Sequence, residues 1–149
     1  MSGFFIAYPF SFAKQTYHNQ NIDYNLYFGC GMWTVITTDL FNQWLEQQDE
    51  STQEKVLAAL VVLQQQGPSL GRSLVDTVYE SKFTNMKELR VQHRGRPLRA
   101  FFAFDPLRQA IVLCIADKGG KKRFYKDMLD IADEQYQLHL TTLGDKSNG

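Results

Sequence analysis

Three apolar segments joined by two short turns constrain the fold of this chain more than any other feature. The segments are residues 86–92, 98–104 and 109–116, and the residues between them, 93–97 and 105–108, contain the turn formers glycine, proline and aspartate. In the first segment apolar and polar residues alternate from Glu88 to Gln92, and in the second the single polar residue, Arg99, lies between apolar ones, which fits the period of a strand with one buried face. The third segment is apolar on both faces. The pattern therefore predicts an antiparallel meander with residues 109–116 as a central strand.

The alternation also predicts which side chains share a face of the meander. Leu89 and Val91 are expected in the core, whereas Arg90 and Arg99 lie on adjacent strands and are expected to meet on the opposite face. In the second strand the expected core residues are Leu98, Ala100, Phe102 and Phe104. The remaining residues expected to face outward are Glu88 and Gln92 of the first strand and Phe101 of the second.

Helical patterns flank the meander. Residues 33–37 are rich in β-branched side chains and predict a strand, after which Thr38 is placed to cap a helix. Ser51-Thr-Gln-Glu54 has the spacing of a capping box that opens a second helix, and Gly67-Pro68 is a stop signal for it. The expected apolar positions of these helices are Leu40, Phe41, Trp44 and Leu45, and then Val56, Leu57, Leu60, Val61 and Leu63.

The last helix is expected over residues 124–140, with Phe124, Met128, Ile131 or Ala132, and Tyr136 on its buried face. The predicted fold class is α+β: an N-terminal strand, a two-helix hairpin, an antiparallel meander sheet and a C-terminal helix.

Charge is distributed unevenly along the chain. Residues 82–126 contain twelve Lys or Arg and three acidic residues, whereas the whole chain carries 16 basic and 16 acidic residues. Residues 32–81 contain two basic and seven acidic side chains, so the predicted hairpin has an acidic outer surface. A cationic sheet on a neutral protein indicates a polyanionic ligand, and a surface neutralised by the protein's own acidic helices is the alternative.

Composition excludes several classes of protein. No run approaches 18 apolar residues, so no membrane partner or span is expected, and the apolar N-terminus lacks the basic segment of a signal peptide. Cys30 and Cys114 are far apart without metal-ligand spacing, and Cys114 is expected to be a buried thiol. We therefore expect a reduced, cytoplasmic protein without a metal site or cofactor.

Residues 1–31 differ from the rest, because they are rich in Phe, Tyr and Asn and show neither strand nor helix periodicity. They are expected to be an N-terminal extension whose aromatic residues allow it to pack on the domain.

Several motifs, taken in order, resemble those of one known family. They are Gly67–Thr77, Asn85–Arg90, Gly95–Arg99, Phe104–Pro106 and Asp117–Tyr125. Together they resemble the HigB-type toxins of the RelE/ParE superfamily, a group once described as phage-derived proteins. The resemblance covers residues 32–140, which implies a RelE/HigB-like toxin domain over residues 32–143 and a tail at 144–149.

The resemblance implies the toxin of a type II toxin–antitoxin system, a ribosome-dependent endonuclease that cleaves mRNA. Its implied partners are the ribosome, mRNA and a HigA-like antitoxin with a helix-turn-helix domain, through which alone it would contact operator DNA. A non-catalytic protein of the same fold, which poisons a target such as gyrase or only binds RNA, is the alternative.

Metal-free RNA cleavage needs a base for the ribose 2′-hydroxyl, cations around the phosphate, and an acid for the leaving 5′-oxygen. Arg90 and Arg99 are the candidates for the phosphate contact, and the resemblance places Tyr125 at a position where a tyrosine stacks on a base or transfers a proton. A phenol acts as a base only if neighbouring cations lower its pKa, so the base stays open between Tyr125, His93, Glu88 and an indirect arrangement. The expected nucleic-acid-binding residues are Lys87, Arg94, Arg96, Lys118, Lys121, Lys122 and Arg123.

Overall fold

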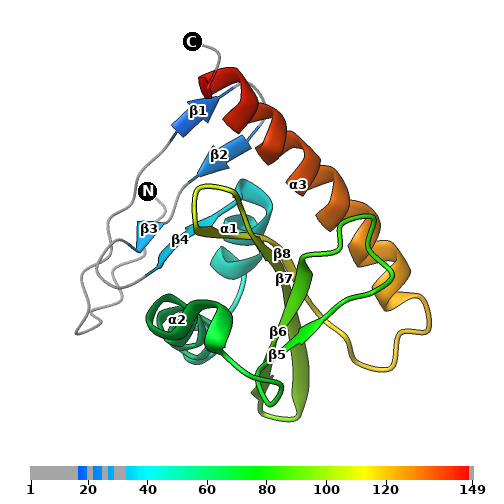
Figure 1. The fold of residues 1–149 in the computed structure, drawn as a ribbon. Helices are drawn as coiled ribbons and strands as arrows, with labels where there is room; N and C mark the ends of the chain where they lie inside the picture. Colours follow the sequence, from blue (N-terminus) through cyan, green and yellow to red (C-terminus); the bar gives the residue numbers. More distant parts are fainter. Residues whose placement is uncertain (1–16, 20–21, 25–26, 29–32, 148–149) are drawn as a thin grey trace.

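The protein is built around one mixed β-sheet (Figure 1). The computed structural model describes residues 17–19, 22–24, 27–28 and 33–147. Helices α1 (Asp39–Glu46) and α2 (Glu50–Gln66) cover one face of the sheet, and α3 (Phe124–Ser147) covers the other. The six strands, in spatial order, are β3 (Tyr27–Phe28), β4 (Thr34–Thr37), β8 (Gln109–Asp117), β7 (Arg96–Phe104), β6 (Met86–His93) and β5 (Val75–Thr77).

The predicted meander is confirmed. Strands β6, β7 and β8 pair antiparallel in sequence order, and β4 adds to β8 in parallel. Because β4 and β7 pair with β8 on either side, β8 is a central strand, as its apolar sequence predicted. The fold class α+β is confirmed as well. The short strand β5, which pairs with β6, had not been predicted.

The sheet is buried on both faces, which corrects one expectation. Phe101 was expected to point outward, but its side chain is 0% exposed because α3 covers it. Alternation alone assigns a residue to a face, and only the position of α3 shows that both faces are covered. The same covering buries Glu88, which was also expected on the outward face.

One apolar position predicted for the helices is wrong, because Leu40 is 41% exposed. Of the two residues expected at one position of α3, Ala132 is buried and Ile131 is 39% exposed, and Leu129, which had not been predicted, is 3% exposed. The thiol of Cys114 is buried as expected, and burial raises its pKa to about 12. Cys30 lies outside the described residues.

The N-cap of α2 differs from the prediction. The helix begins at Glu50, and its cap is Asp49, whose carboxylate accepts a hydrogen bond from the Thr52 backbone N–H at 2.9 Å. Ser51 therefore lies inside the helix, and the expected capping box over residues 51–54 is not formed. Asp49 satisfies an orphan amide of a helix that begins two residues earlier than predicted, and it also places a negative charge at the helix N-terminus.

The other two helix signals are confirmed. Thr38 caps α1: its Oγ1 accepts from Phe41 N and donates to the Leu113 carbonyl at 2.6 Å, where β8 bulges opposite Phe101 and Phe102 of β7. Helix α2 ends at Gln66, and its C-cap, Gly67, has φ +54° and lies against the indole ring of Trp33. A side chain at this position would overlap that ring, so the glycine both ends the helix and admits Trp33.

Part of the expected N-terminal extension joins the domain. Strand β3 pairs antiparallel with β4, and β2 (Ile22–Tyr24), which pairs with β1 (Tyr17–Asn19), contacts α1 and α3. Residues 1–16 lie outside the described residues. At the other end α3 continues through Ser147, beyond the predicted end at residue 140 and into the expected tail.

Polar contacts fix the position of α3 along the sheet. Asp133 accepts hydrogen bonds from Ser81 Oγ and the Lys82 backbone N–H, which attaches the β5–β6 loop to the helix. One turn later, Asn85 Nδ2 lies 3.0 Å from the Tyr136 hydroxyl. No helix within the described residues is long and apolar enough to cross a membrane.

Candidate functional site

Arg90 and Arg99 are directly opposite each other on β6 and β7, as the sequence predicted. Side chains at such positions extend from Cβ atoms about 4.5–5.5 Å apart. Arg90 is the more accessible of the two, with 37% of its side chain exposed against 14% for Arg99. The strand register therefore brings two permanent positive charges together at one place on the sheet.

Two carboxylates hold this arginine pair. Glu88 Oε1 accepts from Arg90 Nε and lies 3.1 Å from Arg90 Nη2, while Glu88 Oε2 lies 3.9 Å from Arg99 Nε. Asp76 of β5 accepts from Arg90 Nη2 at 3.0 Å. The side chain of Glu88 is only 5% exposed, whereas that of Asp76 is 33% exposed. Glu88 is thus the charge-pair partner that its place in a basic segment indicated.

Tyr125 adjoins this group from the first turn of α3. Its ring meets those of Phe101 and Phe124 edge-on, with centroids 6.1 and 5.4 Å away, and Lys118 Nζ lies 5.2 Å from its centroid. Burial raises the pKa of the Tyr125 hydroxyl, and the Glu88 carboxylate raises it further, against the opposing effect of Arg99. This direction is the opposite of what a general base needs. The phenol keeps its proton at neutral pH and is available as a donor.

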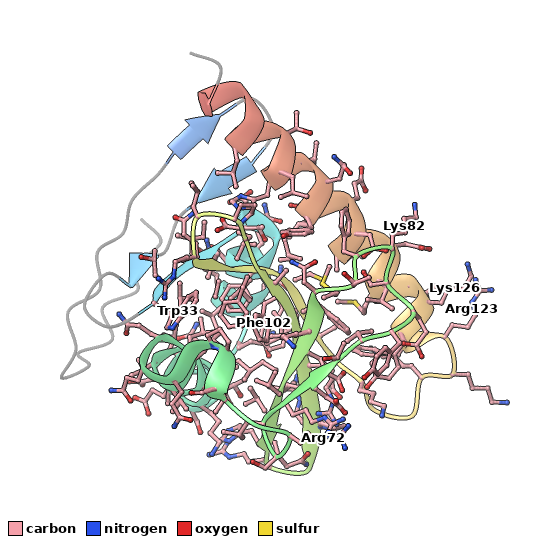
Figure 2. All side chains as sticks on the ribbon, in the orientation of Figure 1. Trp33, Arg72, Lys82, Phe102, Arg123 and Lys126 are labelled. Carbon is pink, nitrogen blue, oxygen red and sulfur yellow. The ribbon has the colours of Figure 1, made fainter. Side chains whose placement is uncertain are left out.

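Lys118, Lys121, Lys122 and Arg123 follow β8 and lead directly into α3, so the chain itself connects this basic loop to Tyr125. Lys121 and Lys122 are exposed, and Arg123 forms an exposed pair with Asp127 at 3.9 Å. Figure 2 shows Arg123 and Lys126 extending away from the body of the protein beside α3. These four residues form a cationic rim next to the arginine pair.

The structure places the three remaining basic candidates elsewhere. Arg94 lies 3.7 Å from Asp49 in the α1–α2 connection, and Arg96 pairs with Asp117 at 3.0 Å and approaches Gln48. Lys87 Nζ donates to Thr77 Oγ1 at 3.3 Å, and its place in β6 is on the opposite face from Glu88 and Arg90. Each of these cations has a partner within the protein.

His93 is also distant from the arginine pair. Its Nε2 lies 3.0 Å from Ser51 Oγ of α2, so the histidine faces the helix hairpin and not Tyr125. This position removes His93 from the candidates for the base. Within the part of the chain that the structure describes, no group of three or more His, Cys, Asp or Glu side chains is arranged to hold a metal ion.

Comparisons with known proteins show which family the chain belongs to. Residues 43–137 match the family model described as "Phage derived protein Gp49-like (DUF891)". This chain belongs to the Gp49-like family. The predicted resemblance to the HigB-type toxins is thereby confirmed, because two similar proteins of Mycobacterium tuberculosis (strain ATCC 25618 / H37Rv) are named as such toxins.

The first of these Gp49-like relatives, "Putative toxin HigB2", is 44% identical over 115 residues, which are 76% of this chain and 57% of the relative. The second, "Putative toxin HigB3", is 42% identical over 109 residues, which are 72% of this chain and 94% of the relative. This chain therefore spans little more than half the length of HigB2 and nearly all of HigB3. No solved structure matches it.

Sequence reasoning missed one member of the candidate site. Asp76 carries no sequence signal, because its contact with Arg90 arises only from the pairing of β5 with β6, where Asp76 is opposite Glu88. Three residues between short turns do not show a strand period, so β5 and its aspartate could not be recognised. Glu88 had a weak signal, as the single acid in the first strand of a basic segment.

Proposed function

We propose that this chain is the toxin of a type II toxin–antitoxin system and that it cleaves mRNA on the ribosome. The observation that carries this proposal is the grouping of Arg90, Arg99 and the protonated Tyr125 beside a cationic rim. Two guanidinium groups offer paired donors to a phosphate, and the rim lysines offer the less specific contacts that bind a nucleic-acid backbone. The HigB names of the two relatives favour the same class of function.

The proposed reaction assigns one role to each residue. The ribose 2′-oxygen attacks the neighbouring phosphorus, the bond from phosphorus to the 5′-oxygen breaks, and a 2′,3′-cyclic phosphate and a 5′-hydroxyl result. Arg90 and Arg99 stabilise the charge that develops on the non-bridging oxygens, and Tyr125 gives its proton to the departing 5′-oxygen. The 2′-hydroxyl proton passes to water or to a ribosomal group. Because arginines supply the positive charge, we expect cleavage to need no other metal ion. It should persist in a purified ribosome assay when EDTA removes metal ions other than Mg²⁺, whose free concentration is held constant for the ribosome.

Primer extension on cellular mRNA after brief induction of the chain tests this function. We expect discrete breaks inside translated codons, together with an early arrest of protein synthesis. Arg99→Ala should remove the breaks while leaving ribosome binding nearly intact. Its control is Arg108→Ala, which changes an exposed arginine of the β7–β8 turn beside Trp33 and should cleave like wild type. Intact mRNA with early DNA damage and continuing translation would favour a gyrase poison instead.

The proposed antitoxin must keep the cationic site of this protein from RNA. It acts either by masking residues 86–104 or by clamping the acidic helices at residues 38–66 and preventing access to the ribosome by its bulk. Hydrogen exchange on the purified complex distinguishes the two, since added protection at residues 86–104 means masking and added protection at 38–66 means steric exclusion. Failure of any neighbouring gene product to relieve toxicity would contradict the toxin–antitoxin assignment.

A further inference from the structure

The least exposed charge at the proposed site is a carboxylate and not an arginine. The side chain of Glu88 is 5% exposed, in the middle of a surface whose function is assigned to cations. Its neighbours across the two adjacent strands are Asp76 and Phe101, so it lies between β5 and β7 and under the first turn of α3. A buried carboxylate is costly unless cations and donors compensate it, so its contacts need a physical reason.

The two oxygens of Glu88 have different partners. Oε1 accepts a hydrogen bond from Arg90 Nε and lies within ion-pair distance of Arg90 Nη2, both at 3.1 Å. Oε2 lies 3.9 Å from Arg99 Nε, and neither of these two buried atoms forms a hydrogen bond of normal length within the described residues. The same carboxylate acts on the Tyr125 hydroxyl, because Glu88 adds to the effect of burial in raising the pKa of Tyr125. One carboxylate thus contacts or influences all three proposed catalytic residues.

Without an anion at this place, Arg90 and Arg99 would repel each other. Arg90 and Arg99 are directly opposite on neighbouring strands, and two like charges at such positions repel. Their side chains would turn apart toward solvent, since guanidinium groups remain charged at every accessible pH. Asp76 cannot take the place of Glu88 between the two arginines, because it contacts only Nη2 of Arg90 and its side chain is itself one-third exposed.

We propose that Glu88 is a positioning residue: its buried carboxylate holds Arg90 and Arg99 in the orientation that receives the phosphate and keeps the Tyr125 hydroxyl beside them as a proton donor. This inference rests on the proposed function. It assigns no bond-making step to Glu88, because Oε1 accepts from Arg90, Oε2 lies 3.9 Å from Arg99 Nε, and the side chain has almost no surface for the substrate.

Glu88→Gln tests the proposal, because it keeps the size of the side chain and removes the charge. Glu80→Gln is the matched control, since it makes the same change on an exposed residue of the β5–β6 loop. The first readout needs no RNA: tyrosinate absorbance is titrated in each variant with and without Tyr125→Phe, and the difference reports Tyr125 alone. We expect its midpoint to move to lower pH in Glu88→Gln and to stay in place in Glu80→Gln and Asp76→Asn.

The second readout is single-turnover cleavage on programmed ribosomes. Displacement of catalytic groups by about 1 Å costs on the order of 10²-fold in rate, so Glu88→Gln should lose about that factor while its affinity for ribosomes stays unchanged. Glu88→Asp keeps the charge on a shorter side chain; it should recover part of the rate, and it serves as the test variant if Glu88→Gln does not fold.

The outcomes distinguish the proposed function from the positioning role of Glu88. Inactive wild-type protein with the expected Tyr125 shift would refute the proposed function and leave the contact between Glu88 and Tyr125 standing. An unshifted Tyr125 together with wild-type cleavage in Glu88→Gln would overturn the positioning role. A slow Glu88→Gln enzyme whose cleavage has lost the acidic limb of its pH profile would also overturn it, because that pattern indicates a general base.

Discussion

The contact between Asp105 and His139 should contribute more to stability than any surface ion pair of this protein. Asp105 lies in the β7–β8 turn with a fully buried side chain, and His139 lies on α3 with 1% of its side chain exposed. Asp105 Oδ2 accepts from His139 Nε2 at 2.6 Å and from Gln109 Nε2 at 2.9 Å. Its Oδ1 accepts the backbone N–H groups of Leu107 and Gln109 at 2.9 and 3.0 Å.

Asp105→Asn should therefore destabilise the protein by about 3 kcal/mol. The asparagine oxygen can still accept the two backbone N–H groups, but its NH₂ group would face two donors, His139 Nε2 and Gln109 Nε2. Loss of a hydrogen bond to a charged group costs about 1.5–3 kcal/mol, and the second unsatisfied donor adds roughly 1 kcal/mol. The total agrees with the roughly 3–5 kcal/mol that follows when one partner of a buried pair is removed. For a domain of this size the melting temperature should fall by about 10 °C.

Thermal and urea denaturation measure this loss, with Asp127→Asn as the control. Asp127 forms an exposed pair with Arg123, so its substitution should change the stability by less than about 0.5 kcal/mol. A melting temperature of Asp105→Asn equal to that of the control would refute the reasoning. It would mean that His139 adopts the tautomer whose Nε2 accepts a hydrogen bond from the new amide.

The same contact predicts how stability depends on pH. Burial acts to raise the pKa of Asp105, but hydrogen bonds from His139 and Gln109 outweigh it and hold the pKa below its ordinary 3.8. A group whose pKa is lowered on folding stabilises the native state above its ordinary pKa, and this contribution is lost as the pH falls through the lowered value. Urea midpoints of wild type and Asp105→Asn should therefore converge below pH 3.8 and differ most at neutral pH.

Three further substitutions have specific expected results. Tyr125→Phe keeps the contacts of the ring and should slow single-turnover cleavage by on the order of 10²-fold with ribosome binding unchanged; a wild-type rate would leave Arg90 and Arg99 as the chemical centre. Lys121→Ala combined with Lys122→Ala should weaken ribosome binding and flatten its log–log salt dependence by roughly 0.7–0.9 for each phosphate that is no longer neutralised, with cleavage of bound mRNA preserved. Gly67→Ala should lower the melting temperature, because the residue has φ +54° and its Cβ would overlap the ring of Trp33, whereas Gly71→Ala, in open space, should not.

Local patterns in the sequence were sufficient wherever the deciding interactions are short-range. The strand period and the turns at residues 93–97 and 105–108 predicted the meander, and the hairpin register that follows placed Arg90 opposite Arg99. The chain also connects the basic loop directly to Tyr125. Half of the candidate site could therefore be predicted, because a hairpin and a loop–helix junction need no knowledge of the rest of the fold.

The tertiary structure decided what surrounds those residues. Helix α3 packs on a sheet face that alternation had left to solvent, so Phe101 and Glu88 are buried and Tyr125 lies beside a carboxylate that raises its pKa. Asp76 and His139 were not recognised, since each contacts a residue far from it in sequence, Arg90 and Asp105 respectively. A sequence records periodicity and capping over a few residues, whereas burial and charge pairing depend on which distant segments meet. For this protein the sequence determined where the arginines lie, and only the packing of α3 and β5 determined which carboxylates hold them.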